Sequence, residues 1–442
     1  MFSEEPLIHV GILSDVKVNF ILRGNYLYNG SIYFGEKTVK YAAGKLKFEN
    51  CLYSEITFEP QDEHSYFDLL NVTIGINFHW ERRETQQFRG TLRFSVIGSQ
   101  ITAINCIRTE DYLLSVISSE MSARASTELL KAHAVISRSW LLAPLMDATR
   151  TGTTVTPTET RTELPDKTLK IVKWYERNAH TGFDVCADDH CQRYQGITKA
   201  STEKVAKAIE ETRGLVLMSG NEICDARFSK SCGGATETFE NCWAPEHFSY
   251  LEKIYDNDNQ VIPIDLSIEE NAQKWIRQSP EAFCNTSDAN ILSQVLNNFD
   301  QETTDFYRWK TEYTQNQLSD LIAKKSGLDI GSIIDITPVK RGESGRIVEL
   351  KITGTKRTVV VGKELEIRKW LSESHLYSSA FVIDKKFGTD DQLPERFILT
   401  GAGWGHGVGL CQIGAAVMGE KGYDFSKILQ HYFKSAELKK LY

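Results

Sequence analysis

The chain of 442 residues is predicted to fold as an α+β protein. Apolar residues alternate with other residues through residues 8–106, helical spacing replaces this alternation after Thr109, and alternation returns in residues 333–367. A chain of this length is expected to bury more than one apolar centre. The predicted parts are a β-rich N-terminal part of the core (1–108), a helical hairpin with a Cys/His loop and a cleft (109–258), a smaller inserted α+β lobe (259–395), and a glycine-rich loop with C-terminal helices that complete the core (396–442).

Strands are predicted in the N-terminal part because its apolar residues have a period of two. The alternating positions are Val10, Ile12, Val16, Val18, Phe20, Ile74, Ile76, Phe78, Leu92, Phe94 and Val96. Residues 97–100 separate two such runs, and Gly98 supplies a backbone conformation that other residues disfavour. We therefore expect a hairpin turn there.

Two helices are predicted next. Thr109 is expected to cap a helix whose first turn carries Glu110 and Asp111, which the helix dipole favours. A second helix is expected from Ser126 or Thr127 to about residue 146. Glu120 then lies at the junction of this hairpin of helices.

The remaining elements follow from turn and cap signals. They are an exposed Thr-rich loop (150–162), a helix (202–211), a strand pair (214–228), a glycine-containing loop (229–238), two helical stretches within 267–325 with the second closing on Gly327, strands in 333–367, a helix (412–420) and a last helix capped by Asp424.

Composition excludes several classes of protein. With 41% hydrophobic and 25% charged residues the chain is an ordinary globular one. A net charge of −8 without a basic face argues against a nucleic-acid partner. No apolar run approaches the roughly 20 residues that span a bilayer, so a transmembrane protein is not expected. Residues 1–19 lack the pattern of a secretory signal.

Nine cysteines are distributed unevenly. Cys224, Cys232 and Cys242 form a loose cluster in the sequence. Four others are scattered and are predicted to be small buried apolar residues: Cys51, Cys106, Cys284 and Cys411.

Glu120 is the first candidate for chemistry. A carboxyl group at the junction of two helices is held rigidly, as a positioned acid must be. Lys131 and Arg138 are seven residues apart on the second helix and therefore share a face. If that face lines a cleft, it offers one carboxyl group and two cations. The alternative is a set of surface salt bridges.

Glycine occupies every second position from Gly401 to Gly409. This leaves bare backbone on one side of an extended segment, which allows close approach by a ligand or by another part of the chain. The segment has neither the Lys-Ser/Thr of a P-loop nor the context of a dinucleotide fingerprint.

A third candidate lies in a polar loop that contains His180, Cys186, His190 and Cys191. Two thiolates and two imidazoles match a closed tetrahedral zinc site without a vacant position for water, which would be structural. The alternative is a pair of unrelated buried cysteines with exposed histidines. A zinc hydrolase is disfavoured because four ligands leave no open position.

Six motifs together resemble the SpoIID/LytB (stage II sporulation protein D, amidase enhancer) family, and the resemblance runs from about residue 8 to the end of the chain. They are Glu110-Asp111-Tyr112-Leu113-Leu114, Ser119-Glu120-Met121, Leu130-Lys131-Ala132-His133-Ala134-Val135 with Arg138, Thr212-Arg213-Gly214-Leu215-Val216-Leu217, Ser231-Cys232-Gly233-Gly234-Ala235-Thr236-Glu237 and Gly403-Trp404-Gly405-His406-Gly407-Val408-Gly409-Leu410-Cys411-Gln412. Ser122 and Cys232 depart from the family, which often has Pro and Ser there.

The resemblance implies a lytic transglycosylase that cleaves the MurNAc-GlcNAc bond of peptidoglycan glycan strands, often those stripped of stem peptides by an amidase. Glu120 matches the catalytic glutamate of the family. It also implies a cell-envelope or periplasmic location and, for some members, a zinc ion in a two-His, two-Cys loop like that at residues 180–191. Residues matching its cleft and glycan-facing loops are Lys131, Arg138, Ser231, His406 and Gln412.

The family also implies the main alternative, a glycan-binding enhancer of an amidase that does not cut. A single carboxyl group suffices for a transglycosylase, whereas glycosidases that use water generally need two. The enzyme hypothesis therefore depends on Glu120.

Overall fold

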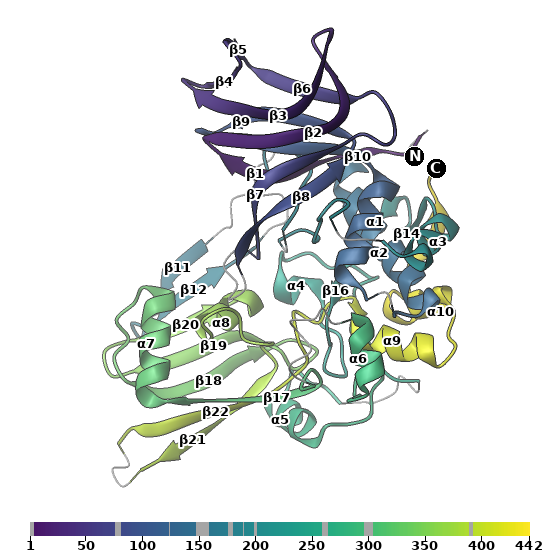
Figure 1. The fold of residues 1–442 in the computed structure, drawn as a ribbon. Coiled ribbons are helices and arrows are strands. Elements are labelled where there is room, and N and C mark those ends of the chain that lie inside the picture. Colours follow the sequence, from purple (N-terminus) through teal and green to yellow (C-terminus); the bar gives the residue numbers. More distant parts are fainter. Residues whose placement is uncertain are drawn as a thin grey trace.

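A strongly bent sheet of eleven strands forms the N-terminal part of the protein (Figure 1). The structure is a computed structural model and describes residues 4–75, 81–122, 124–146, 159–175, 180–188, 190–198, 201–258, 264–295, 304–388 and 392–442. The main path of the sheet is β13-β1-β10-β9-β6-β2-β3-β4-β5, with β7 pairing with β2 and β8. Its strands are β1 (Leu7–Asp15), β2 (Lys17–Tyr28), β3 (Ser31–Ala42), β4 (Lys45–Phe48), β5 (Cys51–Tyr53), β6 (Glu55–Pro60), β7 (Tyr66–Ile74), β8 (Arg82–Arg89), β9 (Thr91–Ile97), β10 (Gln100–Arg108) and β13 (Val185–Cys186).

The predicted alternation explains which face of this sheet is buried. Phe20 points inward and packs on Phe58 and Phe94, with ring centroids 5.5 and 5.0 Å away. Ile97 pairs with Gln100 across the predicted hairpin, where Gly98 has a φ of 62°. This turn is confirmed, whereas Ile76 and Phe78 lie outside the described residues.

Helices and short strands pack beside the sheet, and the two chain termini lie close together (Figure 1). The helix α2 is central, with contacts to α1, α3, α9, α10 and β14. The elements here are α1 (Thr109–Glu120), α2 (Thr127–Met146), α3 (Glu203–Glu211), β14 (Leu215–Ser219), β15 (Glu222–Ile223), β16 (Phe228–Ser229), α4 (Phe239–Cys242), α6 (Ala289–Val295), β23 (Leu410–Cys411), α9 (Gln412–Glu420), α10 (Phe425–Tyr432) and β24 (Glu437–Lys440).

Of the two helix N-caps predicted from the sequence, Asp424 is confirmed and Thr109 is not. Asp424 and Thr202 accept a hydrogen bond from the backbone of the first turn of α10 and α3, respectively. The predicted cap at Thr109 is wrong, because Arg108 is the N-cap residue of α1 and the Thr109 hydroxyl donates to the carbonyl oxygen of Pro6 instead.

The smaller lobe lies at the lower left of Figure 1 and has an apolar cluster of its own, which includes Leu318, Ile352 and Phe397. Two sheets build it, in the orders β11-β12-β20-β19-β18 and β17-β22-β21. The elements are β11 (Glu159–Glu163), β12 (Leu169–Lys173), α5 (Glu269–Gln278), β17 (Arg308–Thr314), α7 (Gln315–Ser326), β18 (Ile333–Arg341), β19 (Ile347–Gly354), β20 (Thr358–Gly362), α8 (Glu364–Trp370), β21 (Phe381–Phe387) and β22 (Pro394–Ala402).

The lobe and the segment beside it depart from the sequence prediction in three places. Two helical stretches were expected within residues 267–325, but the described residues there contribute to the three helices α5, α6 and α7 and to the strand β17. Residues 159–162 were expected in an exposed loop but belong to β11, because β12 pairs with β20 and draws this segment into the lobe. The rest of the expected loop lies largely outside the described residues. Strands were expected up to residue 367, but α8 begins at Glu364, where helical spacing places Ile367 and Trp370 in the lobe core.

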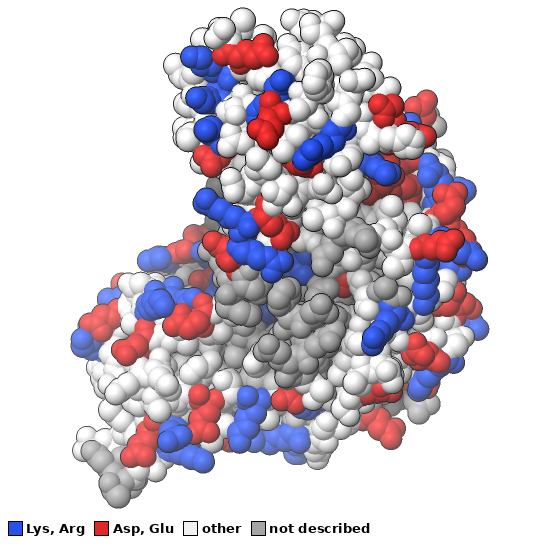
Figure 2. Space-filling model, in the orientation of Figure 1, with Lys and Arg blue, Asp and Glu red and all other residues white. Residues whose placement is uncertain are grey.

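Charges of both signs are interspersed over the face shown in Figure 2. Among the described residues, no helix is both long enough and apolar enough to span a bilayer.

Candidate active site and metal loop

Glu120 is the last residue of α1 and is partly exposed. The turn that follows it is held by Gln294 of α6, whose carbonyl oxygen accepts from the Ser122 N–H (2.9 Å) and whose side-chain oxygen accepts from the Ser126 N–H (3.0 Å). The amide of Gln294 also donates to Glu420 of α9 (2.6 Å). Two further helices therefore hold the junction, and nothing in the local sequence indicated Gln294.

Arg138 lies inside the protein and does not face a cleft. Its side chain is fully buried, and its Nε and Nη2 donate to the two carboxylate oxygens of Glu110 at 2.9 and 2.6 Å. The third donor, Nη1, binds the carbonyl oxygen of Leu215 (2.9 Å). Glu110 also accepts from the hydroxyl of Tyr442 (2.6 Å). This ion pair joins α1, α2 and the C-terminal residue, and it leaves Arg138 with no exposed side-chain surface for a glycan.

Lys131 forms salt bridges, as the alternative interpretation from the sequence stated. Its Nζ lies 2.7 Å from Glu211 and 3.3 Å from Glu128, and its side chain is 16% exposed. The hydrogen bond with Glu211 raises the pKa of Lys131 above its ordinary value. Its charge is already offset within the protein.

Ser231 and Gln412 are also buried. Ser231 forms a β-bridge with Trp404, and its hydroxyl accepts from the Gly233 N–H (3.4 Å). The amide nitrogen of Gln412 lies 3.0 Å from the Nε2 of His133 in the core. Both side chains make contacts inside the protein, and their burial leaves almost no surface for a direct glycan contact.

His406 is partly buried against Trp243, with ring centroids 4.6 Å apart. Burial, reinforced by the charge of Arg227 and other guanidinium groups, holds the pKa of His406 well below its ordinary value. The imidazole is therefore neutral at physiological pH, and its Nδ1 accepts from the Val408 N–H (3.0 Å).

Other parts of the protein occupy the space beside three of the alternating glycines. A Cβ on Gly403 would lie 2.7 Å from the Ser231 carbonyl oxygen, and one on Gly409 would lie 2.1 Å from that of Arg227. A Cβ on Gly407 would meet the guanidinium of Arg346 at 2.3 Å. Of the two alternatives left open by the sequence, close approach by another part of the chain explains these three positions.

The polar loop that contains the candidate metal ligands is named the metal loop below. Its four candidate ligand residues lie close together in space. One ligand atom from each lies within 4.8 Å of the others: His180, Cys186, His190 and Cys191. The Nε2 of His180 is 3.2 Å from the Sγ of Cys191, and the Nδ1 of His190 is 3.5 Å from the same sulfur. A hydrogen bond with Cys191, together with those from both histidines, lowers the pKa of Cys186 far below its ordinary value. Two thiols and two imidazoles at these separations fit a tetrahedral zinc ion.

The sheet anchors this loop. Val185 and Cys186 form β13, which pairs with Val10 and Gly11 of β1. The neighbouring Asp184 carboxylate accepts from the His9 N–H (2.8 Å). Backbone pairing thus positions Cys186 within the loop.

A cavity of about 740 Å³ opens beside the metal loop. It is lined by His180 and Cys186 of the loop and by polar side chains such as Asn19, Arg83 and Gln195. Among its described lining residues Glu120 does not occur. The protein therefore has room for a ligand at a place distinct from the α1–α2 junction.

Two family models match the chain. The model described as stage II sporulation protein (SpoIID) matches residues 98–218, which contain Glu120 and the metal loop. A domain of unknown function (DUF8618) matches residues 237–409, which include most of the smaller lobe.

Curated proteins are similar at low identity. An amidase enhancer of Bacillus subtilis is 25% identical over 333 residues, which cover 74% of this chain and 40% of that protein. A stage II sporulation protein D of Bacillus amyloliquefaciens is 22% identical over 366 residues, 80% of this chain and 83% of that protein. An uncharacterised protein of Brachyspira hyodysenteriae is 24% identical over 99% of this chain and 94% of its own length. Residues 98–218 therefore match the SpoIID family model, and the curated proteins named for that family or as an amidase enhancer are similar to the chain at low identity.

Proposed function

We propose that this protein is a peptidoglycan lytic transglycosylase that cleaves MurNAc-GlcNAc bonds of denuded glycan strands and leaves 1,6-anhydroMurNAc ends. The observation that carries the proposal is the position of Glu120, at a helix junction inside the segment matched by the SpoIID model. Its relatives named for sporulation and for amidase enhancement support a role at the cell wall.

One carboxyl group accounts for the chemistry. Protonated Glu120 donates its proton to the glycosidic oxygen while the bond from that oxygen to C1 of MurNAc breaks. The 6-hydroxyl of the same sugar then bonds to C1 and returns its proton to the Glu120 carboxylate. Water is not consumed, and the side chain ends in its starting state.

This reaction requires Glu120 to carry a proton at the start. Nearby cations oppose that form, because they stabilise a carboxylate. Arg138 is paired with Glu110, and Lys131 with Glu211 and Glu128, so both charges are offset by other carboxylates.

The test is to incubate the full chain with denuded glycan strands and to identify new ends by mass spectrometry. Wild type is expected to produce anhydro ends and Glu120→Gln to produce none. Glu420→Gln is the matched control, since Glu420 is an exposed glutamate joined to the same turn through Gln294. It is expected to retain activity.

Two results contradict the proposal. Anhydro ends that persist in Glu120→Gln remove this residue from the chemistry. If wild type produces reducing ends in place of anhydro ends, and if both Glu120→Gln and Glu420→Gln lose this activity, the reaction is hydrolysis by two carboxylates.

We also propose that the metal loop holds a structural zinc ion through His180, Cys186, His190 and Cys191. When bound, zinc supplies a rigid tetrahedral crosslink and no open position for water. The four side chains orient this loop against β1 and beside the cavity.

The second candidate function is a non-catalytic enhancer of an N-acetylmuramoyl-L-alanine amidase. It is favoured by the relative named amidase enhancer and by the cavity that lies apart from Glu120. Adding wild type and Glu120→Gln to a purified amidase with intact sacculi distinguishes the two. Equal stimulation by both proteins, without anhydro ends, supports the enhancer.

A further inference from the structure

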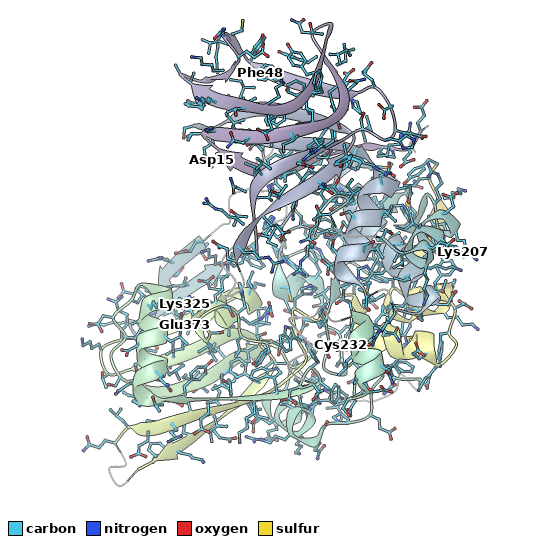
Figure 3. All side chains as sticks on the ribbon, in the orientation of Figure 1. Asp15, Phe48, Lys207, Cys232, Lys325 and Glu373 are labelled. Atoms are coloured by element: carbon cyan, nitrogen blue, oxygen red, sulfur yellow. The ribbon has the colours of Figure 1, made fainter. Side chains whose placement is uncertain are left out.

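Four buried side chains from distant parts of the sequence meet in the interior. Cys232 comes from the loop after β16, Asp256 from the segment after α4, Cys284 from the segment between α5 and α6, and Cys411 from β23. Cys232 is labelled in Figure 3, between the helical part and the smaller lobe. Each of the four is at most 2% exposed.

Their ligand atoms have the separations of a metal site. One atom from each residue lies within 4.8 Å of the others, and the sulfurs of Cys232 and Cys284 are 3.6 Å apart. A disulfide requires about 2.05 Å, so these two thiols are not bonded. In a tetrahedron with zinc–sulfur bonds of about 2.3 Å, adjacent sulfurs lie about 3.75 Å apart. The observed separation is close to that edge.

Hydrogen bonds already orient the ligand atoms. The backbone N–H groups of Cys232 and Gly234 point to the sulfurs of Cys411 (3.2 Å) and Cys232 (3.4 Å), respectively. The Asp256 carboxylate accepts from the Cys284 N–H (2.9 Å) and from the Tyr432 hydroxyl (2.7 Å). Donors of this kind surround metal-bound thiolates and carboxylates and fix their direction.

A partly buried cation that interacts electrostatically with Cys232 and Cys284 favours a negative charge in the cluster. The guanidinium of Arg308 donates only to backbone carbonyl oxygens, including those of Gly233 (3.0 Å) and Ile276 (2.8 Å). The structure records no ion pair between Arg308 and any described carboxylate. Three thiolates, one carboxylate and a divalent zinc ion together carry two net negative charges, which offset such a cation.

We propose that Cys232, Cys284, Cys411 and Asp256 form a second, closed zinc site of three sulfurs and one oxygen. Zinc accepts carboxylate oxygen beside thiolates, whereas copper(I) selects sulfur alone, so the presence of Asp256 favours zinc. The site joins the loop that carries Ser231 to the start of α9, and thereby fixes the strand partners of the glycine-rich segment. It is independent of any glycan chemistry.

The decisive experiment measures zinc by mass spectrometry in the full chain, purified with reductant and without chelator. Wild type is expected to hold about two zinc ions and the loop variant Cys186→Ser/Cys191→Ser about one, because the interior site stays intact in it. Cys224→Ala, which removes a buried cysteine outside both sets, is the control and should keep the wild-type content. A zinc-free loop variant overturns the proposal.

A second measurement keeps the test independent of how the interior variants fold. The loop variant is stripped of metal and given cobalt(II), which is expected to show thiolate-to-metal absorption and the visible bands of a tetrahedral ion. Adding Cys232→Ser and Cys411→Ser should abolish them. Absence of these bands in the folded loop variant refutes the site. A disulfide between Cys232 and Cys284 also refutes it, if it is detected by alkylating the denatured chain after purification with reductant.

Discussion

Two glutamates of α1 show how differently the same residue type is used at the two ends of one helix. Glu110 in the first turn has a side chain that is 8% exposed and binds Arg138 through both oxygens. Glu120 at the last position is partly exposed at a turn held by α6. Both lie in motifs that resemble the SpoIID/LytB family, yet the second is the more exposed of the two. The buried end of the hairpin supports the structure, and the other end is the candidate for chemistry.

The largest predicted effect is on enzymatic activity, and it distinguishes the Glu120 end of α1 from the Glu110 end. Glu120→Gln is expected to lower transglycosylase activity by about 10²–10⁴-fold, the usual contribution of a positioned acid/base. Its free energy of unfolding should change little. Product formation under single-turnover conditions and urea unfolding measure the two quantities. A variant that unfolds early would show that Glu120 is structural like Glu110.

The second prediction concerns stability at the buried end. Arg138→Met leaves the Glu110 carboxylate buried without its partner, and removing one member of such a pair costs about 3–5 kcal/mol. Urea denaturation monitored by circular dichroism gives the value. The double variant Arg138→Met/Glu110→Gln should recover part of the loss. If the single variant is as stable as wild type, the contrast between the two ends fails.

A third prediction concerns His133, which lies on α2 between Lys131 and Arg138 in the sequence. Burial lowers the pKa of His133 to about 3, against 6.5 in the unfolded chain. Between these values the unfolded state binds the extra proton, so stability falls as the pH drops below 6.5. At about pH 4.5 the loss from this residue is about 2–3 kcal/mol.

The measurement is the free energy of unfolding of wild type and His133→Asn from pH 7 down to pH 4.5. The variant should be less stable at neutral pH but should lose less on acidification. Parallel curves would mean that His133 is not the buried neutral group that the structure places beside Gln412.

The smallest effect is expected at Lys131. Its ion pairs with Glu211 and Glu128 lie near the surface, and such pairs contribute about 0–1 kcal/mol. Lys131→Met should therefore change stability by less than about 1 kcal/mol. A loss comparable to that of Arg138→Met, in the same denaturation assay, would show that the two cations on this face are equivalent after all.

The local elements of the fold could be predicted from the sequence. The hairpin at Gly98, the bounds of α2 and the cap at Asp424 depend on neighbouring residues and agree with the structure. The strand β11 and the helix α8 could not, because pairing with β12 and burial in the lobe core decide them. Such contacts come from residues far away in the chain.

The candidate site shows the same division. Lys131 and Arg138 share a helix face, as their spacing requires, but the spacing does not say which protein groups cover that face. Glu110 and Leu215 cover Arg138. The role of Gln294 at the Glu120 turn had no local signal at all.

The sequence by itself determined local elements such as α2 and the close grouping of His180, Cys186, His190 and Cys191, because those depend on residues a few positions apart. Only the tertiary structure decided that Cys232 lies with Cys284 and Cys411, and not with Cys224 and Cys242, its neighbours in the sequence. Of the four scattered cysteines that were predicted to be buried, Cys284 and Cys411 are buried, but the prediction was wrong for Cys51, which is exposed, and for Cys106, which is partly exposed. Chain folding sets which distant side chains share a low-dielectric interior, and their partners there determine whether they stabilise the protein or bind a ligand.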